Sequence, residues 1–328
     1  MIGSFLNKKY GTYSVNTQLA ESLKNRYEFR FVSEINRKVL RIVDITIACL
    51  FSKYNIIHID VFSGQAFKIA EISAFIAYLR KKKAILSFHG GKLPEFYQKN
   101  PKRIERLISI TGYYRTPSLY LKNYFDQRGI QLHYLPNTID LDRFPYNRKA
   151  VIDHSILWVR AFSEIYNPDL AIRILDKVQK TYGDAKITMI GPDKGLLSKT
   201  MKLINELDLN TSVTILGPIP NNLLYSYYQT HNVFINTTSY ESFGVAVLEA
   251  AACGIPIVSS QVGEIPYMYL NNENIIMVES FEPTAFAVEI CRIFSSQELA
   301  EKLSLNARRL AEQYDFENMK AGWVELLG

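Results

Sequence analysis

The stretch that decides the fold is Val233-Phe-Ile-Asn-Thr-Thr-Ser-Tyr-Glu241-Ser-Phe-Gly244-Val-Ala-Val-Leu-Glu249-Ala-Ala-Ala-Cys-Gly254-Ile-Pro256-Ile-Val-Ser-Ser260. Its apolar start, residues 233–235, predicts a buried strand that ends in a polar loop. A helix follows, and it ends at Gly254 and Pro256, because glycine suits a left-handed residue after a helix and proline cannot continue one. A second strand starts at Ile255. The stretch therefore predicts a strand–helix–strand unit of a parallel sheet.

The helix inside this stretch is expected to begin at Phe243 or Gly244, with Ser242 as its cap. Three apolar side chains are expected on its buried face: Val245, Leu248 and Ala252. A helix that begins here leaves its first backbone N–H groups free, and such groups favour an anion such as a diphosphate. Gly244 has no Cβ to block a close approach. A carboxylate accepts hydrogen bonds from neighbouring hydroxyls, so Glu249 can hold a ribose while Glu241 holds a sugar.

The same alternation of strands and helices runs through the chain. Strands are predicted at 56–61, 84–88, 107–110, 155–159, 186–190 and 213–216, and helices at 65–80, 168–182, 196–207, 222–229 and 296–327. Strands separated by such helices predict parallel sheets. The pattern restarts at 155, after the proline-containing segment 143–149. We therefore predict two doubly wound Rossmann-like domains that face one another, with ligands in the cleft at the carboxyl ends of their strands.

Length and composition are those of a folded two-domain protein. The chain has 328 residues, of which 48% are apolar and 21% charged, which favours two globular domains. Three widely spaced cysteines argue against a disulfide scaffold and against a zinc site. The start shows no signal-peptide pattern. The apolar stretch 42–62 is interrupted by charges, so it predicts a buried helix and a buried strand rather than a membrane span.

Charge divides the chain into two unlike halves. Residues 1–148 hold 24 Lys and Arg against 11 Asp and Glu, a balance of +13, whereas residues 149–328 have a balance of −7. A basic half can face an anionic lipid head group, a membrane surface or nucleic acid. A solvated surface with scattered lysines is the alternative. The basic run Arg80-Lys-Lys-Lys83 suits the C-terminal end of a helix, or a membrane-surface patch.

The chain resembles the retaining family 4 glycosyltransferases of the GT-B fold. Their signature is Glu-x-Phe-Gly-x4-Glu followed by Ala-x-Ala-x-Gly-x-Pro-Val, which Glu241 to Val258 match. Further segments resemble the family: Gly11 to Val15, His89-Gly90, Thr116 to Leu119, Leu135 to Phe144, Met189 to Pro192 and Leu216 to Ile219. The resemblance implies an acceptor-binding domain at 1–148, a donor domain at 149–310 and a final helix at 311–328 that packs back on the first domain.

The resemblance also implies roles for single residues. Glu249 would bind the ribose and Glu241 the donor sugar, and Arg160 would contact the diphosphate. His89 would sit beside the transferred sugar. The remaining donor contacts implied are backbone amides of Phe243, Gly244 and Val245, the turn at Gly11, and Ile219 near the nucleobase. The family uses no DxD metal site, so we expect no metal, and the DxD of Asp140-Leu-Asp142 is read as chance.

Two departures from the family pattern concern the donor site. The family usually has a lysine five residues after the arginine, and Ile165 stands there. Lys194 is a candidate substitute. The Gly-Gly-x-Pro-Glu element of the family is altered to Gly263-Glu-Ile-Pro-Tyr267. Both changes affect the expected donor affinity more than the fold.

Three hypotheses of function remain open from the sequence. The first is a metal-independent retaining hexosyltransferase that needs no resident cofactor. It would move a sugar from a UDP- or GDP-sugar to a glycan or lipid-linked acceptor in surface polysaccharide or glycoconjugate synthesis. The second is an inactive relative that holds a glycan or a partner transferase, motivated by Ile165. The third is a sugar-phosphate synthase. We expect a cytoplasmic protein, peripheral at the inner face of the membrane through its basic half, with no nucleic-acid partner.

Overall fold

The computed structural model describes residues 1–2, 15–32, 35, 37–147 and 153–328. The chain divides into two compact units, one of residues 1–138 with 316–328 and one of residues 139–315. The predicted turn at Gly11 and part of the predicted linker, 148–149, lie outside the described residues. Each unit is an α/β structure built on a parallel sheet. The doubly wound fold predicted from the sequence is therefore confirmed.

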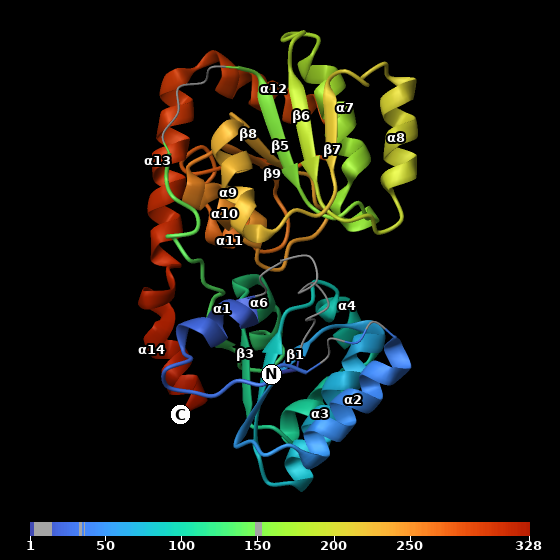
Figure 1. The fold of residues 1–328 in the computed structure, drawn as a ribbon, viewed down its shortest axis with the longest axis vertical. Helices are drawn as coiled ribbons and strands as arrows, with labels where there is room; N and C mark the ends of the chain where they lie inside the picture. Colours follow the sequence, from blue (N-terminus) through green and yellow to red (C-terminus); the bar gives the residue numbers. More distant parts are fainter. Residues whose placement is uncertain (3–14, 33–34, 36, 148–152) are drawn as a thin grey trace. The chain divides into compact units, whose positions relative to one another are not determined.

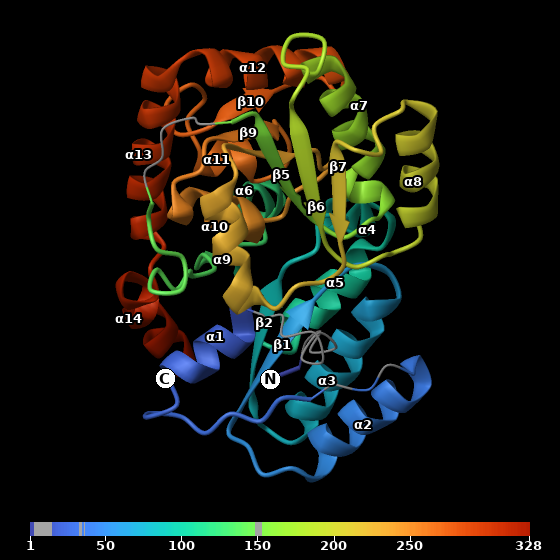
Figure 2. The same ribbon diagram turned by 45° about the horizontal axis from the view of Figure 1, so that its top comes forward.

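The first unit is built on a four-stranded parallel sheet in the order β1-β2-β3-β4. Its strands are β1 Ile56–Val61, β2 Lys83–Phe88, β3 Tyr113–Thr116 and β4 His133–Tyr134. Its helices are α1 Val15–Ser22, α2 Lys38–Phe51, α3 Phe67–Leu79, α4 Leu93–Lys99, α5 Pro101–Ser109, α6 Leu119–Asp126 and α14 Phe316–Leu327, with a 3-10 turn at Gly64–Ala66. The helices α2 and α3 lie side by side (Figures 1 and 2).

Alternate residues of these strands serve different faces of the sheet. Ile57, Ile59 and Val61 pack in a core that includes residues of α3 and α5. Ile85 points to the other face, where it packs with residues of α1 and α14 such as Trp323. Helices therefore cover both faces of the first sheet, as a doubly wound fold requires.

The second unit is built on a six-stranded parallel sheet in the order β10-β9-β8-β5-β6-β7. Its strands are β5 Ser155–Val159, β6 Lys186–Ile190, β7 Val213–Leu216, β8 Val233–Asn236, β9 Ile257–Ser260 and β10 Ile276–Val278. Its helices are α7 Pro168–Val178, α8 Leu197–Glu206, α9 Asn221–Thr230, α10 Val245–Cys253, α11 Ile265–Met268, α12 Pro283–Ser295 and α13 Gln297–Gln313, with a 3-10 turn at Glu164–Tyr166.

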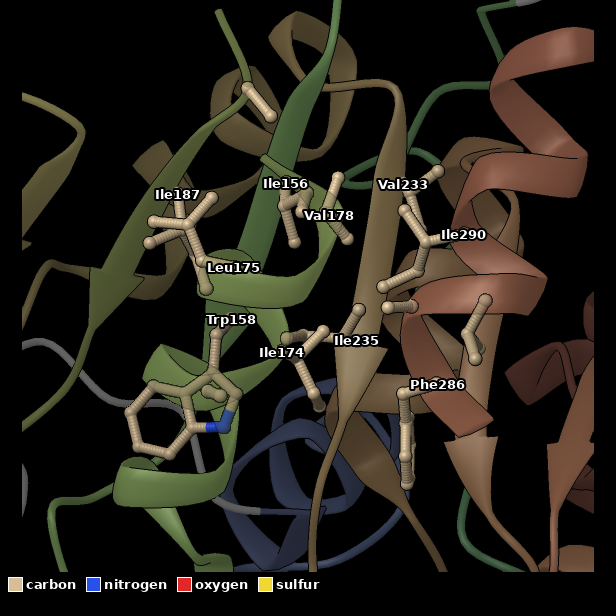
Figure 3. Packing of buried hydrophobic residues seen from close by; sticks show 14 of the residues in the cluster. Ile156, Trp158, Ile174, Leu175, Val178, Ile187, Val233, Ile235, Phe286 and Ile290 are labelled. Carbon is tan, nitrogen blue, oxygen red and sulfur yellow. The ribbon is translucent and has the colours of Figure 1, made fainter. Parts of the chain in front are cut away.

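Two cores flank this second sheet. Ile156 and Trp158 of β5 pack with α7 and α12 on one face, where Ile174 and Phe286 are buried (Figure 3). Leu157, between them in sequence, packs with residues of α9, α10 and α13 on the other face. The strands β5, β6 and β7 agree with the sequence prediction. The continuous apolar run of β5 is that of a central strand buried on both faces.

One predicted strand is wrong. Residues 107–110 are expected to form a strand, but Leu107 lies in α5, which has proline at its first position and buries Ile104 and Leu107 at a helical spacing of three. The next strand along the chain is β3, which is not predicted because its residues Tyr113 and Arg115 are polar. The segment 296–327 is helical as predicted and consists of two helices, α13 and α14.

The helix predicted at the start of the apolar stretch 42–62 is α2, and it is buried on one side only. The inward side of α2 is buried through Ile45 and Cys49, but Ile47 and Phe51 are exposed. Arg80, expected to suit the end of its own helix, donates to the carbonyl oxygens of Cys49 at 2.6 Å and Ser52 at 3.0 Å. It therefore caps the C-terminal end of the neighbouring helix α2.

The compact units divide the chain ten residues before the boundary drawn from the sequence at 148/149. Ile139 and Phe144 pack in a core of the second unit, which explains why that unit begins at Ile139. The C-terminal segment 316–328 belongs to the first unit, where Trp323 and Leu327 are buried against Ile85. Among the described residues, no helix combines the length and apolar character needed to cross a membrane.

Candidate functional site

A polar cluster lies at the carboxyl ends of two neighbouring strands of the second unit. Arg160 directly follows β5, and Asn236 is the last residue of β8. The two strands pair in parallel, so their carboxyl ends meet at one edge of the sheet. Both Nε and Nη2 of Arg160 donate to Oδ1 of Asn236, at 3.2 and 3.1 Å. The sheet register therefore fixes the position of this guanidinium.

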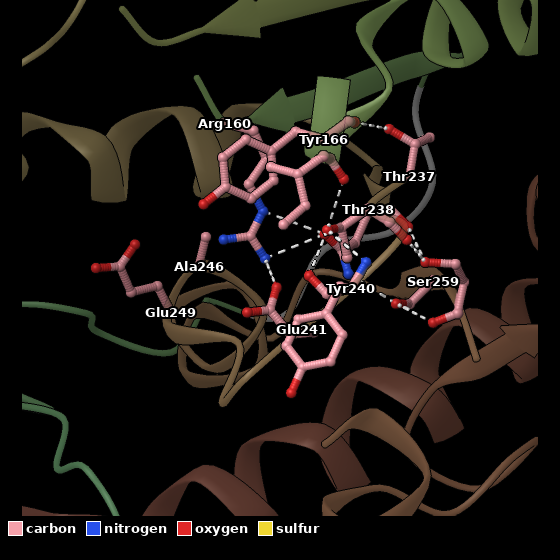
Figure 4. A network of polar contacts seen from close by, with 12 residues as sticks. Arg160, Tyr166, Thr237, Thr238, Tyr240, Glu241, Ala246, Glu249 and Ser259 are labelled. Atoms are coloured by element: carbon pink, nitrogen blue, oxygen red, sulfur yellow. Dashed lines mark hydrogen bonds and ion pairs between the residues drawn. The ribbon is translucent and has the colours of Figure 1, made fainter. Parts of the chain in front are cut away.

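Arg160 also forms an ion pair with Glu241, from the loop that follows β8. Nη2 of Arg160 lies 2.5 Å from Oε2 of Glu241. The side chains are only 10% and 9% exposed, so the pair is weakly screened by solvent. Burial is the largest influence and acts to lower the pKa of Arg160, but the charge of Glu241 and smaller contributions from neighbouring acidic groups, Tyr166 first, together hold that pKa above its ordinary value. Figure 4 shows the pair at the centre of the polar network.

The loop that carries Glu241 is anchored to the start of α11. The backbone N–H of Glu264 donates to the carbonyl oxygen of Glu241 at 2.9 Å. Gly263 adopts a φ of 56°, and a Cβ on it would lie 1.9 Å from that same oxygen. Only glycine fits there. The altered Gly263–Tyr267 element therefore retains the one glycine that this contact requires.

The start of α10 differs in detail from the prediction. Its N-cap is Gly244, with a φ of 89° and no side-chain cap, so the Ser242 cap is wrong. A Cβ on Gly244 would meet only ordinary contacts, the nearest at 3.4 Å, so glycine is needed there for its left-handed φ. Val245 is exposed rather than buried. Phe243 is a core residue whose ring lies 6.0 Å from that of Tyr314, so only its backbone is available to a ligand.

Glu249 is the second carboxylate, one and a half turns into α10. It is 6% exposed. Its Oε1 accepts from Nδ2 of Asn221 and its Oε2 from the hydroxyl of Tyr228, both at 3.0 Å. Burial raises the pKa of Glu249, and these two hydrogen bonds oppose that shift. Each carboxylate oxygen has a second lone pair, so the group can still accept bonds from a ligand hydroxyl.

The loop after Arg160 closes another side of the cluster. Ile165 has no charge to offer a phosphate, and its carbonyl oxygen accepts from the backbone N–H of Ser239 at 2.7 Å and the hydroxyl of Thr238 at 3.0 Å. The ring of Tyr166 lies beside Arg160, with 5.3 Å between the ring centre and Cζ. Burial raises the pKa of Tyr166, so this ring remains neutral.

Two further predicted residues lie in loops of the same unit. Lys194 is exposed in the loop after β6, and its backbone N–H donates to the carbonyl oxygen of Phe162 at 3.1 Å. Ile219 is half-buried between β7 and α9, where it packs against the core that contains Phe243. The structure holds the backbone of Lys194 beside the loop after Arg160.

His89 belongs to the first unit, at the end of β2. Its Nε2 lies 3.2 Å from Oδ1 of Asp60 at the corresponding end of β1. The other oxygen of Asp60 accepts from Nδ2 of Asn16 at 2.8 Å. Burial acts to raise the pKa of Asp60, but its basic neighbours, His89 first and then His58 and Arg115, hold that pKa below its ordinary value. The ring of His89 stacks with Phe62 at 5.9 Å.

Sequence reasoning missed the residues that hold the predicted ones in place. Asn236, Tyr166, Asn221 and Tyr228 all bond or contact a predicted site residue. The only signal for Asn236 is a polar residue at a strand end, and nothing in sequence spacing links Tyr228 to Glu249. Among the described residues, no group of three His, Cys, Asp or Glu is placed to hold a metal ion.

Two Rossmann-like units in one chain are the architecture of the GT-B fold, and the polar cluster lies where ligands bind in such sheets. Solved structures support this fold. Sucrose-phosphate synthase from Thermosynechococcus elongatus aligns with a TM-score of 0.69 at 20% identity, over 87% of this chain and 76% of that one. The Anabaena protein Alr3699/HepE in complex with UDP and glucose aligns with a TM-score of 0.74 at 15% identity, over 97% of this chain and 90% of that one.

The chain belongs to the group 1 glycosyltransferases, because the family model of "Glycosyl transferases group 1" matches residues 146–310, about half of the chain. A D-inositol 3-phosphate glycosyltransferase of Geodermatophilus obscurus is 28% identical over 200 residues, which cover 56% of this chain and 44% of the relative. One component of the phosphatidylinositol N-acetylglucosaminyltransferase of Arabidopsis thaliana is 26% identical over 149 residues, 44% of this chain and 32% of the relative. The chain matches about half the length of such curated relatives or less.

Proposed function

We propose that the protein is a retaining glycosyltransferase of family 4 that uses a UDP- or GDP-sugar and needs no resident cofactor or metal. The observation that carries this proposal is the buried Arg160–Glu241 pair, 2.5 Å apart at the carboxyl edge of the second sheet, beside the N-terminus of α10. Group 1 membership and a similar fold in a structure that contains UDP and glucose support it.

In this proposal the donor occupies the second unit. Arg160 and the first backbone N–H groups of α10, near Gly244 and Val245, bind the diphosphate. Glu249 accepts hydrogen bonds from the ribose hydroxyls, and Glu241 accepts them from the transferred sugar. Ile219 contacts the nucleobase.

The proposed chemistry retains the configuration at the sugar carbon. The bond between that carbon and the diphosphate oxygen breaks while a bond to the acceptor oxygen forms on the same face. The acceptor proton passes to an oxygen of the leaving diphosphate. Arg160 and the helix N–H groups stabilise the charge that develops on this diphosphate. In this scheme Glu241 orients the sugar and forms no covalent intermediate, and His89 lies beside the transferred sugar.

The acceptor in this proposal is a glycan or a lipid-linked molecule, bound mainly by the first unit, and the basic charge of that unit favours peripheral contact with a membrane. The relatives' names support phosphorylated or lipid-linked acceptors, since one name contains inositol 3-phosphate and another phosphatidylinositol. A role in surface polysaccharide or glycoconjugate synthesis follows from this class of acceptor.

A second candidate is an inactive relative that binds a glycan or a partner protein. The observation in its favour is the charge of the site. Arg160 is already neutralised by Glu241, and Ile165 supplies no second cation. Lys194 is the exposed lysine in the adjoining loop. A site without a net positive charge binds a diphosphate weakly unless such a lysine takes part.

Nucleotide binding separates the two candidates. The protein is titrated with UDP, GDP and their hexose conjugates while its thermal unfolding is followed. Glu249→Gln keeps the shape of the side chain but removes its charge, and Glu206→Gln on the exposed end of α8 is the matched control. The transferase proposal predicts a stabilising shift with one nucleotide, weakened roughly tenfold or more by Glu249→Gln because a charged hydrogen bond contributes about 1.5–3 kcal/mol. The absence of a shift with every nucleotide would favour the inactive relative.

A further inference from the structure

The helices α2 and α3 expose an unusual number of large apolar side chains. Nine of them are between 43% and 77% exposed: Val39, Leu40, Val43, Ile47, Leu50 and Phe51 on α2, and Phe75, Tyr78 and Leu79 on α3. They are nine of the nineteen exposed large apolar side chains in the described part of the chain. The two helices lie side by side in both ribbon views (Figures 1 and 2). We call this surface the α2–α3 face.

The spacing along α2 places its exposed apolar residues on one side of the helix. Leu40, Val43, Ile47 and Leu50 follow one another at intervals of three and four, the spacing of a single helical face. The opposite side, with Ile45 and Cys49, is buried in the core of the first unit. The inward side therefore contributes to the core of the first unit. The outward apolar stripe does not, and an exposed apolar patch of this kind marks an interaction site.

Basic residues surround the C-terminal end of this face. Arg80 bonds to two carbonyl oxygens at the end of α2, and Arg30 donates to the hydroxyl of Ser52 at 2.8 Å. Lys53 and Lys81 are exposed next to them. A cavity of about 730 Å³ at the same end is lined by Arg26, Arg30 and Lys53 as well as by apolar side chains. Within α2 the only acidic residue is Asp44.

We propose that the α2–α3 face docks on the surface of a bilayer that contains anionic lipids. An apolar helical face with basic residues at its edge lies in the plane of such an interface, with its apolar side chains at the level of the acyl chains. The 14 residues of α2 are about 21 Å long, too short to span a bilayer. A second copy of the chain would bring two basic rims together, so charge favours the anionic lipid.

The inference deepens the membrane contact of the proposed function and rests on it for its purpose, which is to bring the protein to a lipid-linked acceptor. Its test does not depend on turnover. Vesicle binding needs neither donor nor acceptor, so a failure to bind lipid leaves the nucleotide site untouched. Conversely, a protein that binds vesicles but no nucleotide would sink the transferase proposal alone.

The test is co-sedimentation of the whole chain with vesicles of phosphatidylcholine alone or with roughly one third phosphatidylglycerol. Ile47→Ser with Phe51→Ser removes apolar contacts, and Lys53→Gln with Lys81→Gln removes charge. The matched controls on the second unit are Met201→Ser with Val288→Ser, and Lys180→Gln with Lys202→Gln. All these positions are exposed, so the variants are expected to fold, and an unfolding temperature close to that of the wild type verifies that they do.

We expect binding to the anionic vesicles that falls at least tenfold in each α2–α3 variant and stays within twofold in both controls. Salt should weaken the binding, because the electrostatic part is screened. The proposal is overturned if the wild-type chain does not co-sediment with anionic vesicles, or if the control variants lose as much binding as the α2–α3 variants. It is also overturned if the Ile47 and Phe51 pair instead abolishes a dimer measured by sedimentation velocity.

Discussion

Two buried arginines, one in each unit, are held in opposite ways. Arg160 of the second unit is paired with the carboxylate of Glu241, which keeps its pKa above the ordinary value. Arg115 of the first unit is fully buried and donates to the hydroxyl of Ser87 at 2.7 Å and the carbonyl oxygen of Leu135 at 2.6 Å. Burial lowers the pKa of Arg115 to about 9, although Asp60 opposes that shift.

The remaining partner of Arg115 explains its position. Its guanidinium lies 4.2 Å from the centre of the Trp323 ring, on α14. Arg115 thus ties the last helix of the chain to the first sheet through neutral partners. Arg160 instead lies against a carboxylate that can also accept from a ligand. The comparison teaches that a buried arginine in this fold is structural where its partners are neutral, and available for binding where its partner is a charged site residue.

The largest expected effect is that of Arg115→Ala on stability. The change leaves a cavity under Trp323 and removes the donor to the carbonyl oxygen of Leu135, so the free energy of unfolding of the first unit should fall by about 3–5 kcal/mol. The two tryptophans of the chain fall one in each unit, at 158 and 323. Urea unfolding followed by fluorescence in a Trp158→Phe background therefore reports on the first unit alone. A loss below about 1 kcal/mol would show that Arg115 is not structural.

The second effect sharpens the role assigned to Arg160. Glu241→Gln removes the charge that neutralises Arg160 and keeps the side-chain shape. Binding of the free nucleoside diphosphate should tighten up to roughly tenfold, about 1.4 kcal/mol, while sugar transfer falls by about 100-fold or more. Calorimetric titration and a transfer assay measure the two. Equal losses in both would show that Glu241 only supports the fold.

These two arginines also show what the sequence can predict. Arg160 is predicted as a site residue from the family resemblance, and the apolar run 155–159 places it at the end of a predicted strand. Its pairing with Glu241 joins residues 81 apart, and no local pattern reports such a contact. Arg115 lies in the short polar strand β3, which sequence reasoning missed, so the structural arginine had no signal at all. The roles proposed for the site residues stay predictions.

Acid should weaken the hydrogen-bond network that joins Arg115, Ser87 and His58 in the first unit. His58 shares the hydroxyl of Ser87 with Arg115, and burial lowers the pKa of His58 to about 3. Because the folded pKa lies below the unfolded value of about 6.5, its contribution is complete above that value and is lost as pH falls. The free energy of unfolding of the first unit should therefore fall by about 1.4 kcal/mol for each pH unit between about pH 6 and the folded pKa of about 3. His58→Gln should flatten this slope in the urea experiment, and an unchanged slope would place the titration elsewhere.

The smallest effect concerns Glu249. Tyr228→Phe removes a hydroxyl whose hydrogen bond lowers the pKa of Glu249, so the pKa of Glu249 should rise further. The lost hydrogen bond should cost about 1 kcal/mol in nucleotide affinity. The raised folded pKa means that the charged carboxylate is lost at higher pH than usual. As the pH is lowered, nucleotide binding should therefore be lost earlier, at a higher pH, in the variant than in the wild type. Coincident pH profiles would contradict a role for the charged form of Glu249.

The most direct test compares the two arginines by the same titration. Arg160→Met and Arg115→Met keep similar side-chain lengths and remove the charge, and each folded variant is titrated with the nucleoside diphosphate that binds the wild type. We predict that Arg160→Met weakens binding by roughly tenfold or more, the loss of a charged contact worth about 1.5–3 kcal/mol, and that Arg115→Met leaves it within twofold. Equal affinities in the two variants, or a larger loss in Arg115→Met, would contradict the account.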